Sequence, residues 1–177
     1  MSLCRAYETA PDNTPGGYKQ YRGDMPSSQR SVERLIHIPA ARIFTVLTDI
    51  DQHSVIDGSG MVKGRAKGPA PLVLDSRFTM GMAMRGFPYR TTNHVVEYEP
   101  DRLIAWETIG EFFGKVVFGG QRWRYELEPQ GEDTLVRETY DWGASKAADM
   151  IGRGGAPARM EKAMVATLER LAALVEG

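Results

Sequence analysis

The chain has 177 residues, with 22 basic and 23 acidic side chains and a formal net charge of -1 at pH 7. This length favours one domain with a substantial core. The balanced charge excludes the strongly basic surface typical of proteins that bind nucleic acid or an anionic membrane. The one cysteine, Cys4, excludes an internal disulfide framework and a cysteine-rich metal site.

The sequence shows neither a membrane-spanning segment nor a secretion signal. No apolar run approaches the length of a membrane span, and residues 1–30 lack the apolar segment of a signal peptide. We therefore expect a cytoplasmic protein without membrane insertion.

Residues 1–30 are rich in proline, glycine, serine, asparagine and charge, and they show little periodicity. This composition predicts a polar N-terminal arm, followed by a single domain over residues 31–175. Such an arm becomes ordered only by lying on something, and Tyr7, Tyr18 and Tyr21 are the expected anchors. Attachment to its own sheet would cover an edge, whereas attachment to a second subunit would give a homodimer. The length of the arm favours the homodimer.

The first elements of the domain are a strand and a helix. "SVERLIHI" (31–38) reads as a strand, and Pro39 suits the first turn of a helix over "PAARIFTVLTDI". Ile43, Phe44, Leu47 and Ile50 give that helix an apolar stripe. A polar connection containing glycine follows, and a second strand is expected near 61–67.

The next strand carries unusual side chains. In "FTMGMAM" (78–84), Phe78, Met80, Met82 and Met84 recur at every second residue, so they share one face of a strand. Methionine is not a favoured strand residue, but its soft side chain adapts to varied apolar partners. This face is either core under the last helix or the wall of a ligand cavity.

Four further segments predict an antiparallel meander, because turn signals separate them at suitable intervals. They are "YRTTNHVVEYE", "RLIAWETI", "QRWRYELE" and "TLVRETYDW". Aromatic and aliphatic side chains alternate with charged ones in the last two segments, which predicts a sheet covered on one face only.

The last element is a long helix beginning at Pro157. Met160, Met164, Leu168, Leu171 and Val175 form an apolar stripe along it. This single helix must bury its stripe on the covered, apolar face of the sheet, called the dry face below. The predicted fold class is therefore α+β, with a curved antiparallel sheet wrapped around one long C-terminal helix.

The chain resembles the SRPBCC or helix-grip superfamily, which includes START lipid-transfer domains, Bet v 1-like allergens, and polyketide cyclases and aromatases. It looks most like the polyketide cyclase/dehydrase and lipid transport group. The resemblance rests on "IPAARIFTVLTDIDQH" with "IDGSG" behind it, "VVEYEPDRLIAWE", "WRYELEP" and "TLVRETYDWG", in the right order over residues 31–143. The late helix extends it to residue 175.

This resemblance implies a cavity between the sheet and the last helix that binds a small hydrophobic or aromatic molecule. The residues expected to bind the ligand are Phe78, Met80, Met82, Met84, Trp123, Tyr125, Glu138, Tyr140, Trp142, Met160 and Met164. The resemblance also places His53 and Asp57 near the cavity mouth, at a spacing that allows a pair without fixing its geometry.

Glu138 is the sharpest single signal, because it shares the dry face with Val136, Tyr140 and Trp142. A carboxylate on that face must be paired or have a raised pKa. It is interpreted either as an ion pair with Arg85, Arg90 or Arg124, or as a pocket group that orients a ligand or transfers protons.

Among the histidines, His94 shares strand parity with Val96 and Tyr98. We favour its interpretation as a satisfied hydrogen-bonding side chain, and the alternative is that it reaches the cavity. Glu138, His94 and Tyr140 are therefore the candidate catalytic residues. No metal cluster, phosphate-binding loop, dinucleotide fingerprint or nucleophile elbow is present in the sequence, so we expect no metal and no cofactor.

Three functions remain open. We favour a non-catalytic binder or carrier of a small apolar molecule. The alternatives are a cyclase, dehydratase or aromatase acting on a polyketide-like substrate, and a protein-interaction module.

Overall fold

A computed structural model of the chain describes residues 18–20, 27–112 and 115–177. Its strands are β1 (Tyr18–Gln20), β2 (Gln29–Ile36), β3 (Val62–Lys67), β4 (Arg77–Met84), β5 (Phe87–Glu99), β6 (Leu103–Phe112), β7 (Lys115–Gln130) and β8 (Asp133–Asp141). Its helices are α1 (Ala40–Thr48), α2 (His53–Ile56), α3 (Ala148–Arg153) and α4 (Ala156–Glu176).

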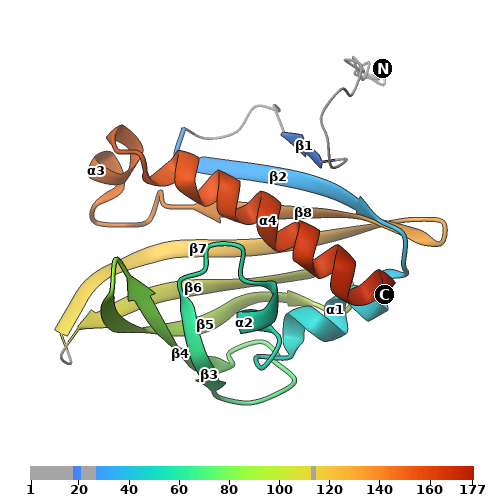
Figure 1. The fold of residues 1–177 in the computed structure, drawn as a ribbon, viewed down its shortest axis with the longest axis horizontal. Coiled ribbons are helices and arrows are strands. Elements are labelled where there is room, and N and C mark those ends of the chain that lie inside the picture. The colour runs from blue at the N-terminus through green and yellow to red at the C-terminus, as the bar shows by residue number, and fades with distance from the viewer. Residues whose placement is uncertain (1–17, 21–26, 113–114) are drawn as a thin grey trace.

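The strands form one antiparallel sheet in the order β1-β2-β8-β7-β6-β5-β4-β3. The strands from β3 to β8 are a meander, and β2 pairs with the last strand of that meander. The segment containing α1 and α2 carries the chain from β2 to β3, at the far side of the sheet. Helix α4 lies over the inner face along β2 and β8, with α1 and α2 toward its C-terminal half (Figure 1). The predicted α+β architecture is thereby confirmed.

The core lies between the sheet and α4. Met164, Leu168, Leu171 and Val175 of the predicted helical stripe are buried, and Met160 is half-buried. The opposite side of α4 carries exposed charged residues, as the helical period requires. Burial of the apolar stripe is the main force that holds the helix on the sheet.

Sharp changes of register bend the sheet. One register shift lies in β5 between Val95 and Glu97, and two others lie in the pairing of β6 with β7. An extra residue in one strand increases the local twist and moves the following side chains to the other face.

The N-terminal arm was predicted to end at residue 30, and the structure extends the first core strand slightly into it. Strand β2 begins at Gln29, and β1 pairs with β2 of its own chain, with Tyr18 opposite Arg34 and Gln20 opposite Val32. Residues 18–20 thus lie along the sheet's own edge. Tyr7 and Tyr21 lie outside the described residues, and the homodimer stays a prediction.

Two elements were absent from the sequence prediction. The connection after α1 contains the short helix α2, and the glycine-rich segment after β8 contains α3. Both are short, so their periodicity is weak. Among the helices of the described residues, none is both long and apolar enough to cross a membrane.

Candidate ligand-binding site

A buried carboxyl group lies at the centre of the inner face. Glu138 on β8 is only 2% exposed, and it lies directly opposite Tyr125 on β7. The Tyr125 hydroxyl donates a hydrogen bond of 2.7 Å to Glu138 Oε1. Glu138 Oε2 is buried and has no hydrogen-bond partner among the described residues.

The surroundings of Glu138 favour its neutral form. The pKa of Glu138 is raised to about 8: burial is the largest cause, the Tyr125 hydrogen bond opposes the shift, and the negative charge of Asp57 adds to it. Burial also raises the pKa of Tyr125 well above its usual range, with Glu138 adding to the effect. Near neutral pH, Glu138 is therefore a carboxylic acid that can donate a hydrogen bond through its free oxygen.

The ion pair considered for Glu138 does not form. Arg124 lies on the opposite face of the sheet, where it bonds to Glu97 and Glu126. Tyr125 is the hydrogen-bond partner of Glu138 that sequence reasoning missed. The sequence did show that Tyr125 shares a strand face with Trp123. Only the register between β7 and β8 places Tyr125 opposite Glu138.

Aromatic side chains surround this carboxyl group. Trp106 stacks on Tyr125 with ring centroids 5.5 Å apart, and Trp123 lies 4.8 Å from Tyr140. Tyr140 in turn lies 5.4 Å from Trp142, which is almost fully buried. These rings come from β6, β7 and β8 and the residue after β8, so neighbouring strands build a continuous aromatic wall.

Helix α2 brings His53 onto that wall. The His53 ring stacks on Trp106 at 5.2 Å and meets Phe78 edge-on at 5.4 Å. Its Nε2 lies 2.9 Å from the Leu47 carbonyl oxygen, which can only accept, so Nε2 carries the proton. Burial lowers the pKa of His53, and the ring is neutral with an unprotonated Nδ1.

Asp57 does not join His53 in a side-chain pair. Its carboxylate accepts hydrogen bonds from the Ser59 backbone and hydroxyl and from the Val62 backbone. Its charge nevertheless acts on the inner face, because burial raises the pKa values of Glu138 and Tyr89 and the Asp57 charge adds to both shifts. The loop is held close to α4, where the Gly58 backbone donates to Thr167 Oγ1 at 3.0 Å.

The four β4 side chains that were predicted to line the cavity differ in burial. Phe78 is 1% exposed, Met80 is 9% exposed and Met82 is half-buried. Met84 is 56% exposed at the turn into β5, so the prediction that it lines the cavity is wrong. The alternation holds, but the strand runs past the elements that cover its inner face.

For His94, the structure fits a hydrogen-bonding side chain, and the alternative that it reaches the cavity is wrong. Its neighbour across the sheet is Glu107, its Nε2 lies 3.3 Å from Asp75 Oδ1, and its side chain lies on the face opposite Glu138. The register shift between Val95 and Glu97 breaks the parity that was expected to connect His94 to Tyr98. Of the three candidate catalytic residues, the structure brings Glu138 and Tyr140 to one face and leaves His94 on the other.

Sequence reasoning missed a row of polar residues on the inner face. Asn93, Thr108 and Gln121 are neighbours across β5, β6 and β7, beside Phe78 of β4. Each is at most 9% exposed, and the Thr108 hydroxyl donates to Asn93 Oδ1 at 2.8 Å. Their parity with Val95, Trp106 and Trp123 was the available signal, but polar side chains suggested a solvated face.

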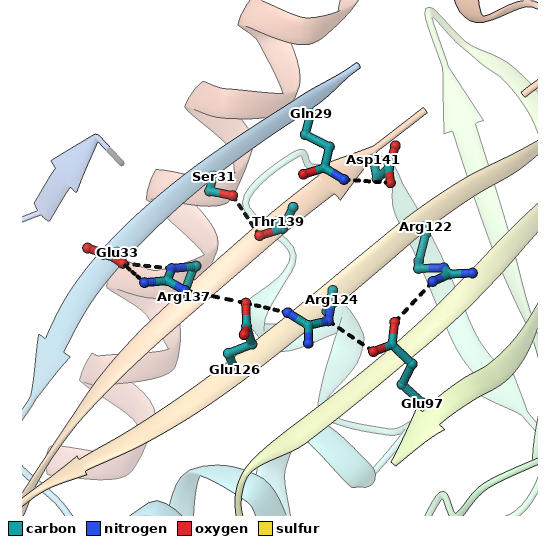
Figure 2. A network of polar contacts seen from close by, with 10 residues as sticks. All are labelled: Gln29, Ser31, Glu33, Glu97, Arg122, Arg124, Glu126, Arg137, Thr139 and Asp141. Atoms are coloured by element: carbon teal, nitrogen blue, oxygen red, sulfur yellow. Dashed lines mark hydrogen bonds and ion pairs between the residues drawn. The ribbon is translucent and has the colours of Figure 1, made fainter. Parts of the chain in front are cut away.

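The outer face of the sheet carries an alternating row of charges that crosses five strands. Figure 2 shows the row from Glu33 through Arg137, Glu126, Arg124 and Glu97 to Arg122. Arg122 also pairs with Glu107 on β6, which ends the row. Ala105 is fully buried between Glu97 and Arg124, and its small side chain lets these two meet across β6.

Two cavities of about 430 Å³ and 290 Å³ lie along this charged row. Their lining is rich in acidic and basic side chains, which suits water better than an apolar molecule. Both lie on the face opposite Met80, Met82, Trp123 and Tyr140, so they do not test the pocket predicted there. No group of three or more metal-ligating side chains gathers among the described residues.

An antiparallel sheet curved along one C-terminal helix, with its aromatic residues on the inner face, defines a helix-grip protein. The chain belongs to the polyketide cyclase / dehydrase and lipid transport family, whose model matches residues 28–176.

Relatives and solved structures agree with this assignment. An uncharacterised protein of Mycobacterium tuberculosis, Rv0088, is 36% identical over 152 residues, which are 80% of this chain and 62% of that protein. The chain thus spans less than two thirds of this relative's length. The crystal structure of Ms6760 from Mycobacterium smegmatis matches with a TM-score of 0.65 at 14% identity, over 90% of this chain and 98% of that one. DynU16, a protein in the dynemicin biosynthetic locus, matches with a TM-score of 0.59 at 16% identity, over 85% of this chain and 48% of that one. At these identities the two structures share the fold.

Proposed function

We propose that the protein binds or carries a small hydrophobic or aromatic molecule on the inner face of the sheet, beneath α4. The observation that carries the proposal is Glu138, a buried carboxyl group with one free oxygen amid aromatic side chains. A binding site for a small molecule combines apolar walls with a few convergent polar groups. Trp123, Tyr140 and Met80 supply such walls, and Glu138 supplies a polar group that fixes orientation.

The family supports the apolar character of this ligand, since its description joins polyketide chemistry to lipid transport. The side chains on β4 add adaptability, because a thioether surface fits ligands of varied shape. Ligand entry is expected near Asp57, whose charge acts on Glu138 from the loop after α2.

The test compares one substitution at two places on β4. Met82 is half-buried on the inner face, whereas Met84 is exposed at the turn, so Met84→Glu is the matched control for Met82→Glu. Titration with the neutral dye Nile red should show binding to the wild type and to Met84→Glu. It should be at least about tenfold weaker for Met82→Glu, because a carboxylate in an apolar site is unfavourable.

Circular dichroism will establish that both variants are folded. Equal affinity of the two folded variants, or no binding of the dye to the wild type, would reject the proposal. Mass spectrometry of small molecules extracted from the purified native protein would then identify what the site holds.

A second candidate function is a cyclase or dehydratase acting on a polyketide-like substrate. It is favoured by the pKa of Glu138, which burial raises to about 8 and so brings close to neutral pH, where a general acid or base is effective. Tyr125 would then orient the carboxyl group through its 2.7 Å hydrogen bond. Incubation with a linear polyketone thioester distinguishes the two functions. A cyclase would accelerate ring closure of this compound and Glu138→Gln would abolish that activity, whereas a carrier would not accelerate it.

A further inference from the structure

The inner face carries polar atoms that the Glu138 site does not use. Thr91 Oγ1, Asn93 Nδ2 and Gln121 Oε1 are buried, and none has a hydrogen-bond partner within the part of the chain that the structure describes. Buried polar side-chain atoms are normally paired, so unpaired groups close together need an explanation.

These atoms belong to one local site. Asn93 and Gln121 flank Thr108 in a cross-strand row, and Thr91 lies two residues from Asn93 on the same face of β5. Thr108 donates to Asn93 Oδ1, and this bond leaves the Asn93 amide group to donate elsewhere. The site therefore offers one amide donor, one amide acceptor and one hydroxyl, all uncharged.

The site is separated from Glu138 along the strands. Gln121 and Tyr125 lie four residues apart on β7, which corresponds to roughly 13 Å at the rise of a β-strand. The aromatic wall of Trp106, Trp123 and Tyr140 occupies the interval between them. An elongated planar molecule lying along this wall would reach both polar ends.

We propose that Thr91, Asn93 and Gln121 form a second polar subsite, which binds an uncharged hydroxyl or carbonyl group at the end of the ligand remote from Glu138. The inference rests on the proposed function and extends it to the ligand's chemical class: a flat, largely apolar molecule with a neutral oxygen group at each end. A carboxylate would leave Gln121 Oε1 without a donor, so the subsite selects against a charged end. Thr108 is a positioning residue, because it acts through the Asn93 amide.

Apigenin and chrysin are suitable probes, because these two flavones differ in one hydroxyl group at the far end of the molecule. Chrysin can satisfy one polar end of the site, whereas apigenin can satisfy both. Isothermal titration should give the wild type about tenfold higher affinity for apigenin, the scale of one hydrogen bond to a buried group that is otherwise unpaired. In Gln121→Met and Asn93→Leu, the ratio of the two affinities should fall close to one.

Thr108→Val and Thr139→Val form a matched pair. Each removes a hydroxyl that hydrogen-bonds to a side chain, but Thr139 bonds to Ser31 on the outer face. Thr108→Val should reduce the apigenin preference, and Thr139→Val should retain it.

Without ligand, Gln121→Met should melt at a higher temperature than the wild type, because the substitution removes a polar atom that has no partner. A lower melting temperature would mean that the oxygen is satisfied in the free protein, and it would overturn the proposal. An apigenin preference that survives in folded Gln121→Met and Asn93→Leu would overturn it as well.

The outcomes separate the two proposals. A wild type that binds Nile red but shows no apigenin preference overturns the polar subsite and leaves the proposed function in place. A wild type that binds neither Nile red nor the flavones overturns both.

Discussion

Replacing Glu138 with glutamine should remove a pH-dependent part of the protein's stability. The pKa of Glu138 is about 8 in the folded protein, against an ordinary value of 4.5, and burial is the main cause. The folded state therefore holds this proton more tightly than the unfolded state does. Its contribution to stability is present below the unfolded pKa and is lost as pH rises through the folded pKa.

The size of this effect follows from the two pKa values. Between them, each pH unit changes the free energy of unfolding by about 1.4 kcal/mol for one proton. Raising pH from about 5 to about 8 should therefore reduce the stability of the wild type, relative to Glu138→Gln, by about 3.5 kcal/mol. Glutamine keeps the shape of the carboxylic acid and has no charge to gain.

Urea unfolding followed by circular dichroism, at several pH values across this range, gives the comparison directly. Other titrating groups contribute equally to both proteins, so their effects cancel in the difference. Glu128 is exposed on β7, and Glu128→Gln is the control that should track the wild type at every pH. If the curves for the wild type and Glu138→Gln run parallel from acid to mildly alkaline pH, Glu138 does not titrate as the reasoning requires.

Three further substitutions test other parts of the structure. Tyr125→Phe removes the bond that lowers the pKa of Glu138, so the loss of stability should shift to higher pH in the same urea series; an unchanged midpoint would contradict this. Gly58→Ala should destabilise the protein by about 2 kcal/mol or more in urea unfolding, because the added Cβ would lie 2.1 Å from a carbonyl oxygen of α4. The control Gly152→Ala meets nothing closer than 3.5 Å inside a helix and should be neutral or stabilising. Arg124→Ala should cost about 1 kcal/mol at low salt and less at high salt, since it bridges two acidic side chains on the outer face; a salt-independent effect would indicate lost packing instead.

The sequence predicted the fold well where side chains keep a regular period. Alternation in "WRYELE" and "TLVRETYDW" placed Trp123, Tyr125, Glu138 and Tyr140 on one face, because β7 and β8 are regular over those residues. The stripe of α4 was equally readable, since a long helix repeats its pattern several times.

Prediction failed where the period is interrupted or where one strand depends on its neighbour. His94 was assigned to the wrong face because the shift near Val95 cannot be seen in the residue types. To predict that Tyr125 is the partner of Glu138, one must know the register between β7 and β8. Hydrophobic alternation shows which face each side chain is on, but it does not show which two residues lie opposite each other. Asn93 and Gln121 were overlooked because polar residues normally indicate solvent, whereas these two are buried on the inner face.

The two faces of this sheet differ in what they contribute. The outer face carries ion pairs between strands, and the inner face carries the apolar core. Within the described part of the chain, a row of ion pairs joins β2, β8, β7, β6 and β5 on the outer face. Substitutions on the inner face therefore leave these cross-strand ties untouched while they reshape the surface offered to a ligand. The inner face can therefore change one side chain at a time while the outer-face ion pairs continue to join the strands, and the stability of each variant depends on how well its core repacks.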